Sequence, residues 1–248
     1  FDYVHQDVER SGIWEPRTTE YIKANLKAGQ TFLDIGAQAG YFSVLASSLG
    51  AKVIAFEPSS ENRKCLEANC PGIQIIGKAL SNASGSVKLN IGNTPGEHSI
   101  LENYHNGTGF EMVDMVRYDD LNIGVPDMIK IDIEGAEKMA LEGMPSVLKT
   151  DKPITLILED WHNKVTDWLI DEYGFSLVTT DRVSGNRIHG KNKGYVYAEE
   201  PIRCHLLGTF HATNTLKDEG IGNAFGTKVV NMAKLLSQLR HYIIFYGV

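Results

Sequence analysis

The sequence predicts an α/β fold, a Rossmann-like and mostly parallel sheet with helices on both faces. Short apolar runs alternate with helical segments along most of the chain, as expected for strands that are covered on both sides. Two of these runs, 31–34 and 53–56, lead into acids, Asp34 and Glu57, and the glycine turn Gly36–Gly40 follows the first. Acids and glycines at the carboxyl ends of neighbouring parallel strands are typical of a nucleoside pocket.

The first part of the chain supplies three strands, each preceded by or followed by a helix. Pro16 suits a first helical position and Gly29 a helix end, and Ser59 or Ser60 suits a helix cap. The predicted order is helix 16–28, strand 31–34, helix 41–49, strand 53–56, helix from 59 or 60 to 69, and strand 73–76. Weaker alternation over 83–118 predicts a hairpin and a long loop, and long loops are often functional.

The second part repeats the pattern and then closes the sheet. The predicted elements are strand 128–133, a helix from Glu134-Gly135 through Leu148, strand 153–158, helix 165–173, and an antiparallel closing pair of strands at 175–179 and 194–198 around a polar loop. Residues 1–200 are therefore predicted to form one domain.

The last residues break this order. Residues 203–211, 224–239 and 241–246 read as strand, helix and strand. A single β-α-β unit cannot bury its own faces. We interpret residues 201–248 as the partial opening of a second α/β domain.

Composition excludes several classes of protein. The chain has 248 residues and a formal net charge of -7, with no basic block that would favour nucleic acid. No apolar run reaches the roughly 18 residues that a membrane span needs. The three cysteines form neither a disulfide framework nor a spaced metal site, so reduced thiols and a cytoplasmic location are expected. The chain begins at Phe1 without Met or a signal peptide, so a fragment of a longer protein is one interpretation.

The glycine turn favours one nucleoside cofactor over another. A dinucleotide loop usually has three glycines, and the middle one is absent from Asp34–Gly40. An acid before the first glycine would repel a pyrophosphate and attract a cationic amino-acid group. The pattern therefore favours S-adenosylmethionine over NAD, with Glu57 accepting hydrogen bonds from the ribose. Alternatively, Asp34 binds only backbone amides and the turn needs glycine only for its geometry.

A second group of acids follows the later strands. Asp132 ends one inner strand, and Glu159 and Asp160 end the next. Clustered carboxylates repel one another unless a cation neutralises them, and a hard divalent cation such as Mg²⁺ suits oxygen ligands. Glu134 could then take a proton from a substrate hydroxyl. The alternative is that these acids only cap helices. Trp14 and Trp161 could form walls of the pocket, or they could be ordinary packing. His98 and His105 could line an acceptor site, or they could be surface histidines.

Five segments together resemble the FkbM family of methyltransferases. They are Trp14-Glu15-Pro16, Phe32–Tyr41, Ala55–Pro58, Ala79-Leu80-Ser81 and Ile129–Glu137, in order over about residues 1–200. The resemblance implies the class I methyltransferase fold and S-adenosylmethionine-dependent transfer to oxygen, often on a sugar or natural-product hydroxyl. It implies cofactor contacts at Glu15, Asp34, Gly36, Ala37, Gly40, Tyr41, Glu57, Pro58, Ser59, Ala79, Leu80 and Asp132.

Related sugar O-methyltransferases bind a divalent ion, which by resemblance would be Mg²⁺ or Mn²⁺ held by Asp132, Glu159 and Asp160, with Glu134 as the catalytic base. Residues 203–248 resemble the opening of a nucleotide-sugar glycosyltransferase, through Gly220–Gly226 and Ile243–Gly247. That resemblance implies an in-chain glycosyltransferase partner and a small-molecule or glycan acceptor. An NAD-dependent oxidoreductase, or a non-catalytic methyltransferase-fold module, remains the alternative.

Overall fold

The computed structural model describes residues 8, 11–102, 109–161, 164–181 and 184–191. Its helices are α2 (Pro16–Asn25), α3 (Tyr41–Ser48), α4 (Ser60–Asn69), α5 (Glu137–Glu142), α6 (Pro145–Leu148) and α7 (Lys164–Tyr173). Its strands are β1 (Thr31–Ile35), β2 (Lys52–Phe56), β3 (Gln74–Ile76), β4 (Ala79–Leu80), β5 (Gly85–Ile91), β6 (Gly109–Val116), β7 (Met128–Ile131), β8 (Ile154–Glu159), β9 (Ser176–Thr180) and β10 (Asn186–Lys191).

The main sheet has the strand order β3-β2-β1-β7-β8-β10-β9. The first five strands in this order pair in parallel, and β10 runs antiparallel to both β8 and β9. Chain order reverses between β1 and β7, and ligands of open α/β sheets bind outside the carboxyl ends of the strands at such a point. The predicted fold class is confirmed, including the antiparallel closure.

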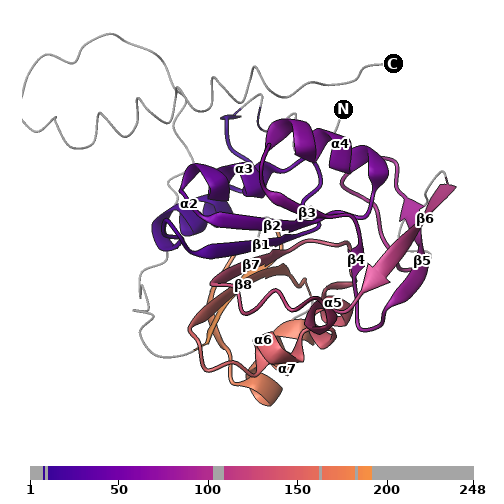
Figure 1. Ribbon diagram of the computed structural model, residues 1–248. Helices are drawn as coiled ribbons and strands as arrows, with labels where there is room; N and C mark the ends of the chain where they lie inside the picture. The colour runs from indigo at the N-terminus through magenta and orange to yellow at the C-terminus, as the bar shows by residue number, and fades with distance from the viewer. Residues whose placement is uncertain (1–7, 9–10, 103–108, 162–163, 182–183, 192–248) are drawn as a thin grey trace, which may run out of the picture. The chain divides into compact units, whose positions relative to one another are not determined.

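Helices cover both faces of this sheet, as Figure 1 shows, with α2, α3 and α4 on one side and α5, α6 and α7 on the other. The inner strands β7 and β8 are almost wholly buried because both of their faces are covered. Leu33, Ile129 and Leu156 join side chains of α5, α6 and α7 in the largest apolar cluster. This two-sided packing fixes the strand ends that carry the candidate site.

A smaller sheet with the order β4-β6-β5 stands beside the first. Its β5 and β6 form the hairpin that the sequence predicts for 83–118, pairing from Gly85 with Met115 to Ile91 with Gly109. The loop after β5 runs back along this sheet, and Ser99 pairs with Asn90 there. The hairpin and its loop therefore border the carboxyl edge of the main sheet.

Three predicted elements differ from the structure. The strand that closes the sheet is β10, which the sequence analysis took as a polar loop. Two of its polar residues are buried and hydrogen-bonded, because Asn186 donates to Glu15 and His189 pairs with the Thr166 hydroxyl. The predicted helix through Leu148 is two helices, α5 and α6, and Pro145 begins the second. Helix α2 ends at Asn25 rather than Ala28.

The strand expected at 194–198, the partial second domain expected at 201–248 and His105 lie outside the described residues. Among the residues that are described, no helix is long and apolar enough to cross a membrane.

Candidate active site

The carboxyl ends of four neighbouring strands bring the predicted site residues to one rim. In sheet order these strands are β2, β1, β7 and β8. Glu57 follows β2, Gly36 follows β1, Asp132 follows β7, and Glu159 ends β8. The sequence predicts this convergence correctly, because parallel strands present their carboxyl ends at the same edge.

The turn after β1 needs glycine where two backbones meet. Gly36 has φ +82°, and a Cβ built on it would lie 1.9 Å from the carbonyl oxygen of Asp132. Gly36 therefore allows the β1 turn to lie against the β7 turn. Gly40 has φ +97°, and its Cβ would meet the Leu66 side chain of α4 at 2.6 Å. Gly40 serves helix packing, so its predicted approach to a ligand is not supported by this geometry.

Glu57 lies almost wholly buried at the end of β2. Its two carboxylate oxygens accept hydrogen bonds from the backbone amides of Gln38 (2.8 Å) and Ser59 (2.9 Å). Burial raises the pKa of Glu57 to about 7, although these amide hydrogen bonds oppose the shift. A carboxylate offers about four acceptor positions, and the Asn62 side chain also hydrogen-bonds to Glu57, so at least one position remains for a further donor. Glu57 thus ties the glycine turn to β2 and keeps capacity to accept hydrogen bonds from a ligand.

Asp34 does not reach the cavity at the rim. Its carboxylate accepts a hydrogen bond of 2.6 Å from the Ser43 hydroxyl of α3, and it is 2% exposed. Burial raises the pKa of Asp34 to about 6. Asp34 therefore fixes the β1 turn to α3, and this geometry does not support the expectation that it meets a ligand ammonium.

A cavity that is partly open to solvent lies along the rim. Of the residues predicted to bind the cofactor, it is lined by Gly36, Glu57, Pro58, Ala79, Leu80 and Asp132, together with the expected base Glu134. The other predicted contacts are absent from its lining: Glu15, Asp34, Ala37, Gly40, Tyr41 and Ser59.

Three of the residues that do not line the cavity make packing or hydrogen-bond contacts elsewhere in the domain. Ala37 packs in an apolar cluster with Leu66, the Tyr41 hydroxyl lies 3.2 Å from the Thr19 hydroxyl, and Ser59 caps α4.

Sequence reasoning missed part of the cavity wall. The loop after β5 contributes Pro95, Gly96, His98 and Ile100. The Asn62 side chain donates to the Pro95 carbonyl at 3.0 Å, which attaches this loop to α4. His98 was considered for an acceptor site, but it lines the same cavity as Glu57, and burial lowers the pKa of its imidazole. The only sequence signal for this wall was the length of the 83–118 loop.

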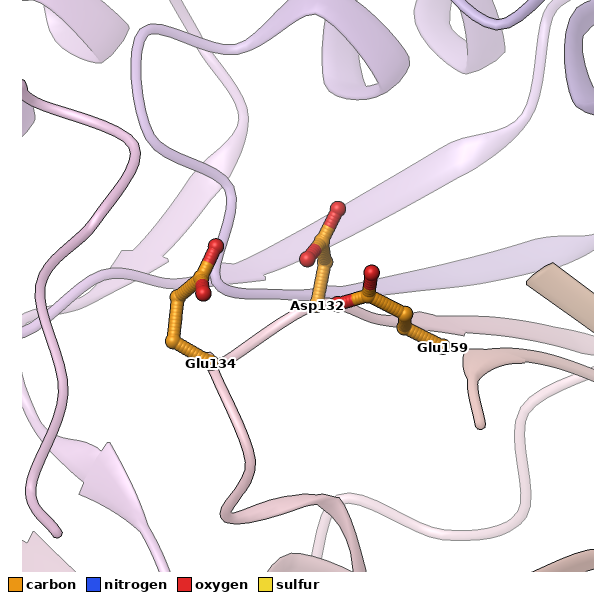
Figure 2. A group of neighbouring side chains, drawn as sticks. All are labelled: Asp132, Glu134 and Glu159. Atoms are coloured by element: carbon orange, nitrogen blue, oxygen red, sulfur yellow. The ribbon is translucent and has the colours of Figure 1, made fainter. Parts of the chain in front are cut away.

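Three half-buried carboxylates gather at the ends of β7 and β8. Asp132, Glu134 and Glu159 each offer one oxygen, and these oxygens all lie within 4.8 Å of one another. Figure 2 shows the three side chains together at the strand ends. Burial, and then the charge of Asp132, raises the pKa of Glu159, whose carboxylate also accepts a hydrogen bond from the Trp161 indole. Such an oxygen set suits a hard divalent cation.

Asp160 is not part of this group. Its carboxylate is buried and accepts a hydrogen bond of 2.8 Å from the backbone amide of Thr166, in the first turn of α7. A carboxylate is stabilised there by the free amides of the helix end. The prediction of Asp160 as a metal ligand is therefore corrected: the acid that lies with Asp132 and Glu159 is Glu134, which was expected as the base.

A buried cation lies beneath the acids. Lys130 is completely buried within β7, and its ammonium lies 2.9 Å from Asp132 Oδ2 and 3.9 Å from Glu15 Oε2. Burial alone would lower the pKa of Lys130, but Asp132 and Glu15 together raise it above its ordinary value. Burial raises the pKa of Glu15 to about 7, opposed by Lys130. Asn186 of β10 also donates to Glu15, at 2.6 Å.

Two of these acids have unusual backbone conformations. Glu15, at the start of α2, and Glu134, after β7, have φ values of 41° and 55°. A left-handed conformation is uncommon for a residue with a side chain and is often found at functional sites. The Ser99 hydroxyl donates to the Glu134 carbonyl at 2.8 Å, which fixes this turn to the loop after β5. The Glu134 backbone is therefore held in this conformation partly by its hydrogen bond with Ser99.

The strand order, with a single antiparallel insertion at β10, and the rim cavity define a class I methyltransferase fold. The model of the methyltransferase FkbM domain matches residues 34–177. The chain therefore belongs to the FkbM methyltransferase family.

Solved structures with this general fold are similar only at low identity. A methyltransferase FkbM from Methylobacillus flagellatus KT is 18% identical with a TM-score of 0.49, over 73% of this chain and 46% of that one. A TehB-like SAM-dependent methyltransferase from Corynebacterium glutamicum is 12% identical with a TM-score of 0.46, over 75% and 91%. A precorrin-6y C5,15-methyltransferase from Geobacter metallireducens GS-15 is 15% identical with a TM-score of 0.44, over 75% and 92%.

The chain spans less than half the length of the Methylobacillus flagellatus protein. No curated protein matches it by sequence. The family assignment therefore rests on the domain model.

Proposed function

We propose that this chain is an S-adenosylmethionine-dependent O-methyltransferase that acts on a hydroxyl of a sugar or glycan with the help of a divalent cation. One observation carries the proposal. Asp132 and Glu134 belong both to the wall of the rim cavity and to the group of three carboxylates. A cofactor in the cavity and a hydroxyl at the acids would therefore meet at the same two residues.

The lining of the cavity suits an adenosine with a cationic tail. Glu57 retains an acceptor position for a ribose hydroxyl, and Leu80, Leu89 and Ile100 offer apolar surface for a planar base. S-adenosylmethionine, when bound, supplies a methyl group on a positively charged sulfur. Asp132 and Glu134 bring negative charge to the end of the cavity where that sulfur would lie.

The acids have two tasks in this proposal. Asp132 and Glu159 would hold Mg²⁺ or Mn²⁺, which would supply positive charge that lowers the pKa of a hydroxyl and orients it. Lys130 balances part of the charge of Asp132 but shares its ammonium with Glu15, so negative charge remains for a cation. Glu134 would accept the proton of the hydroxyl, whose oxygen bonds to the methyl carbon as the carbon–sulfur bond of the cofactor breaks and S-adenosylhomocysteine leaves.

Calorimetric titration with S-adenosylmethionine, with NADH as the control, tests the cofactor. Binding of the first and not the second is expected. Binding of NADH alone would favour the oxidoreductase alternative, and binding of neither would favour a non-catalytic module.

Two variants separate the roles of the acids in an assay of labelled methyl transfer to a panel of glycosides. Glu134→Gln should lower kcat by roughly 10²–10⁴-fold with little change in the Mg²⁺ concentration required. Glu159→Gln should raise that concentration. Full activity of the wild type in excess chelator would show that no cation is needed. An unchanged kcat of Glu134→Gln would show that Glu134 is not the base.

A further inference from the structure

Trp161 combines exposure with a fixed position beside the acids. The residue follows β8 by two positions, and its side chain is 54% exposed. Most tryptophan side chains are buried over more of their surface, because the indole is large and apolar. The exposure of this indole beside the three carboxylates therefore suggests a role in binding.

The indole is held by contacts on two sides. Its Nε1 donates a hydrogen bond to Glu159 Oε1. Its ring edge lies against Gly185, where an added Cβ would come within 2.4 Å of Cε2 and 2.8 Å of Nε1. Gly185 is itself fixed, since its carbonyl accepts from the Asp160 amide at 3.2 Å. Trp161 is therefore ordered before any ligand arrives, which lowers the entropy cost of binding.

The position of Trp161 along the rim separates it from the cofactor side. The cavity is lined by residues that follow β2, β1 and β7, including Asp132 and Glu134, whereas Glu159 and Trp161 follow β8 and are not part of its lining. The three carboxylates thus lie between the cavity and the indole. A group bound on Trp161 would approach the acids from the side opposite the cofactor, as an acceptor must for an in-line displacement.

We propose that Trp161 is the platform on which a sugar ring of the acceptor stacks, an inference that rests on the proposed function. One face of a pyranose ring presents aliphatic C–H groups, which pack on an aromatic face, while its edge presents hydroxyls. Glu159 at the edge of the indole accepts hydrogen bonds from such hydroxyls. The combination of an exposed aromatic face and an adjacent carboxylate therefore selects a sugar ring over a wholly apolar acceptor.

Saturation-transfer NMR tests sugar binding directly, without methyl transfer. The full chain is mixed with S-adenosylhomocysteine and the methyl glycosides of common hexoses and deoxyhexoses. The wild type should transfer saturation to the C–H protons of one glycoside face. Trp161→Ala should abolish that transfer, and Trp161→Phe should keep part of it because a smaller aromatic face remains. Phe110→Ala is the matched control, because Phe110 is 57% exposed on β6, and it should bind like the wild type.

Steady-state kinetics give the second measurement. Trp161→Ala should raise the acceptor KM about tenfold or more, equal to about 1.4 kcal/mol, with the affinity for S-adenosylmethionine within about twofold of wild type. An acceptor KM unchanged in Trp161→Ala, or no saturation transfer from any glycoside to wild type, would overturn the inference.

These outcomes separate the inference from the proposed function. If the wild type methylates a sugar and Trp161→Ala does so with unchanged KM, only the proposed stacking of the acceptor on Trp161 is refuted. If Trp161→Ala loses glycoside binding but no methyl transfer is found in the wild type, the platform stands and the proposed function fails.

Discussion

Replacing Lys130 by Met should destabilise the protein strongly, because its ammonium is the buried cation beneath the acids. The side chain is 1% exposed and lies 2.9 Å from Asp132 Oδ2, 3.9 Å from Glu15 Oε2 and 5.1 Å from the centre of the Phe42 ring. Met has a similar length and no charge, so the substitution removes the charge and leaves little empty volume. Glu15 and Asp34 would then remain buried without the Lys130 ammonium that opposes the rise of their pKa values.

Removing one member of a buried ion pair costs roughly 3–5 kcal/mol. Two features of the structure favour the lower end of this range of free energies. Burial already raises the pKa of Glu15 to about 7, so this carboxyl can take up a proton rather than stay charged. The Asp132 side chain is 34% exposed and keeps contact with water. We therefore expect a loss of about 3 kcal/mol, which corresponds to a fall in Tm of roughly 6–12 °C for a chain of this size.

Urea unfolding at pH 8, followed by circular dichroism, measures this loss. Lys138→Met is the control, because Lys138 is exposed on α5 and lies 5.2 Å from the Trp168 ring centre; it should change the free energy of unfolding by less than about 0.5 kcal/mol. Adding Glu15→Gln to Lys130→Met should recover part of the loss, since the amide oxygen can still accept from Asn186. A Lys130→Met protein within about 1 kcal/mol of wild type would refute the electrostatic reasoning.

Three further predictions concern single positions. Glu57→Gln should weaken S-adenosylmethionine binding about 10–100-fold, as expected for lost hydrogen bonds to a charged group. Glu57→Gln should also make stability less dependent on pH. The pKa of Glu57 in the wild type is about 7 in the folded state and 4.5 ordinarily, so the folded state keeps the proton longer. The Glu57 contribution to wild-type stability therefore falls by about 3 kcal/mol as pH rises from 4.5 through 7. In urea titrations from pH 4.5 to 8 the loss of stability should be smaller in Glu57→Gln than in wild type by about this amount, while Glu15 and Asp34, whose pKa values are also raised, contribute equally to both proteins; equal slopes would contradict it. Gly36→Ala should cost at least about 2 kcal/mol more stability than Gly29→Ala. Both glycines have φ near +80°, but a Cβ on Gly36 would lie 1.9 Å from a backbone oxygen, whereas a Cβ on Gly29 would have nothing within 4 Å. Equal melting temperatures of the two variants would show that the β1 and β7 turns can separate. Asp160→Ala should cost about 1 kcal/mol through the lost cap of α7 and leave the Mg²⁺ requirement unchanged, whereas a raised requirement would restore Asp160 as a ligand.

Local patterns in the sequence were sufficient for the sheet and for most of the rim. Apolar runs mark β1, β2, β7 and β8, and the residue after each run is an acid or lies next to a glycine turn. Because parallel strands end at one edge, the meeting of Glu57, Asp132 and Glu159 there follows without knowledge of the tertiary structure. The strand β10 was missed because its buried polar residues were interpreted as a loop, since hydropathy alone cannot distinguish a paired polar strand from a loop.

The sequence by itself therefore determined the fold class, the family and the edge of the sheet that carries the chemistry, because these depend on periodicity and on residues close together in the chain. Only the tertiary structure decided what each acid does. Asp160 turns to the end of α7, Asp34 turns to Ser43, and Glu15 lies against Lys130 and Asn186, its partner 171 residues away. Side-chain direction and long-range pairing depend on which surfaces pack together, and neither can be predicted from the local pattern of residues.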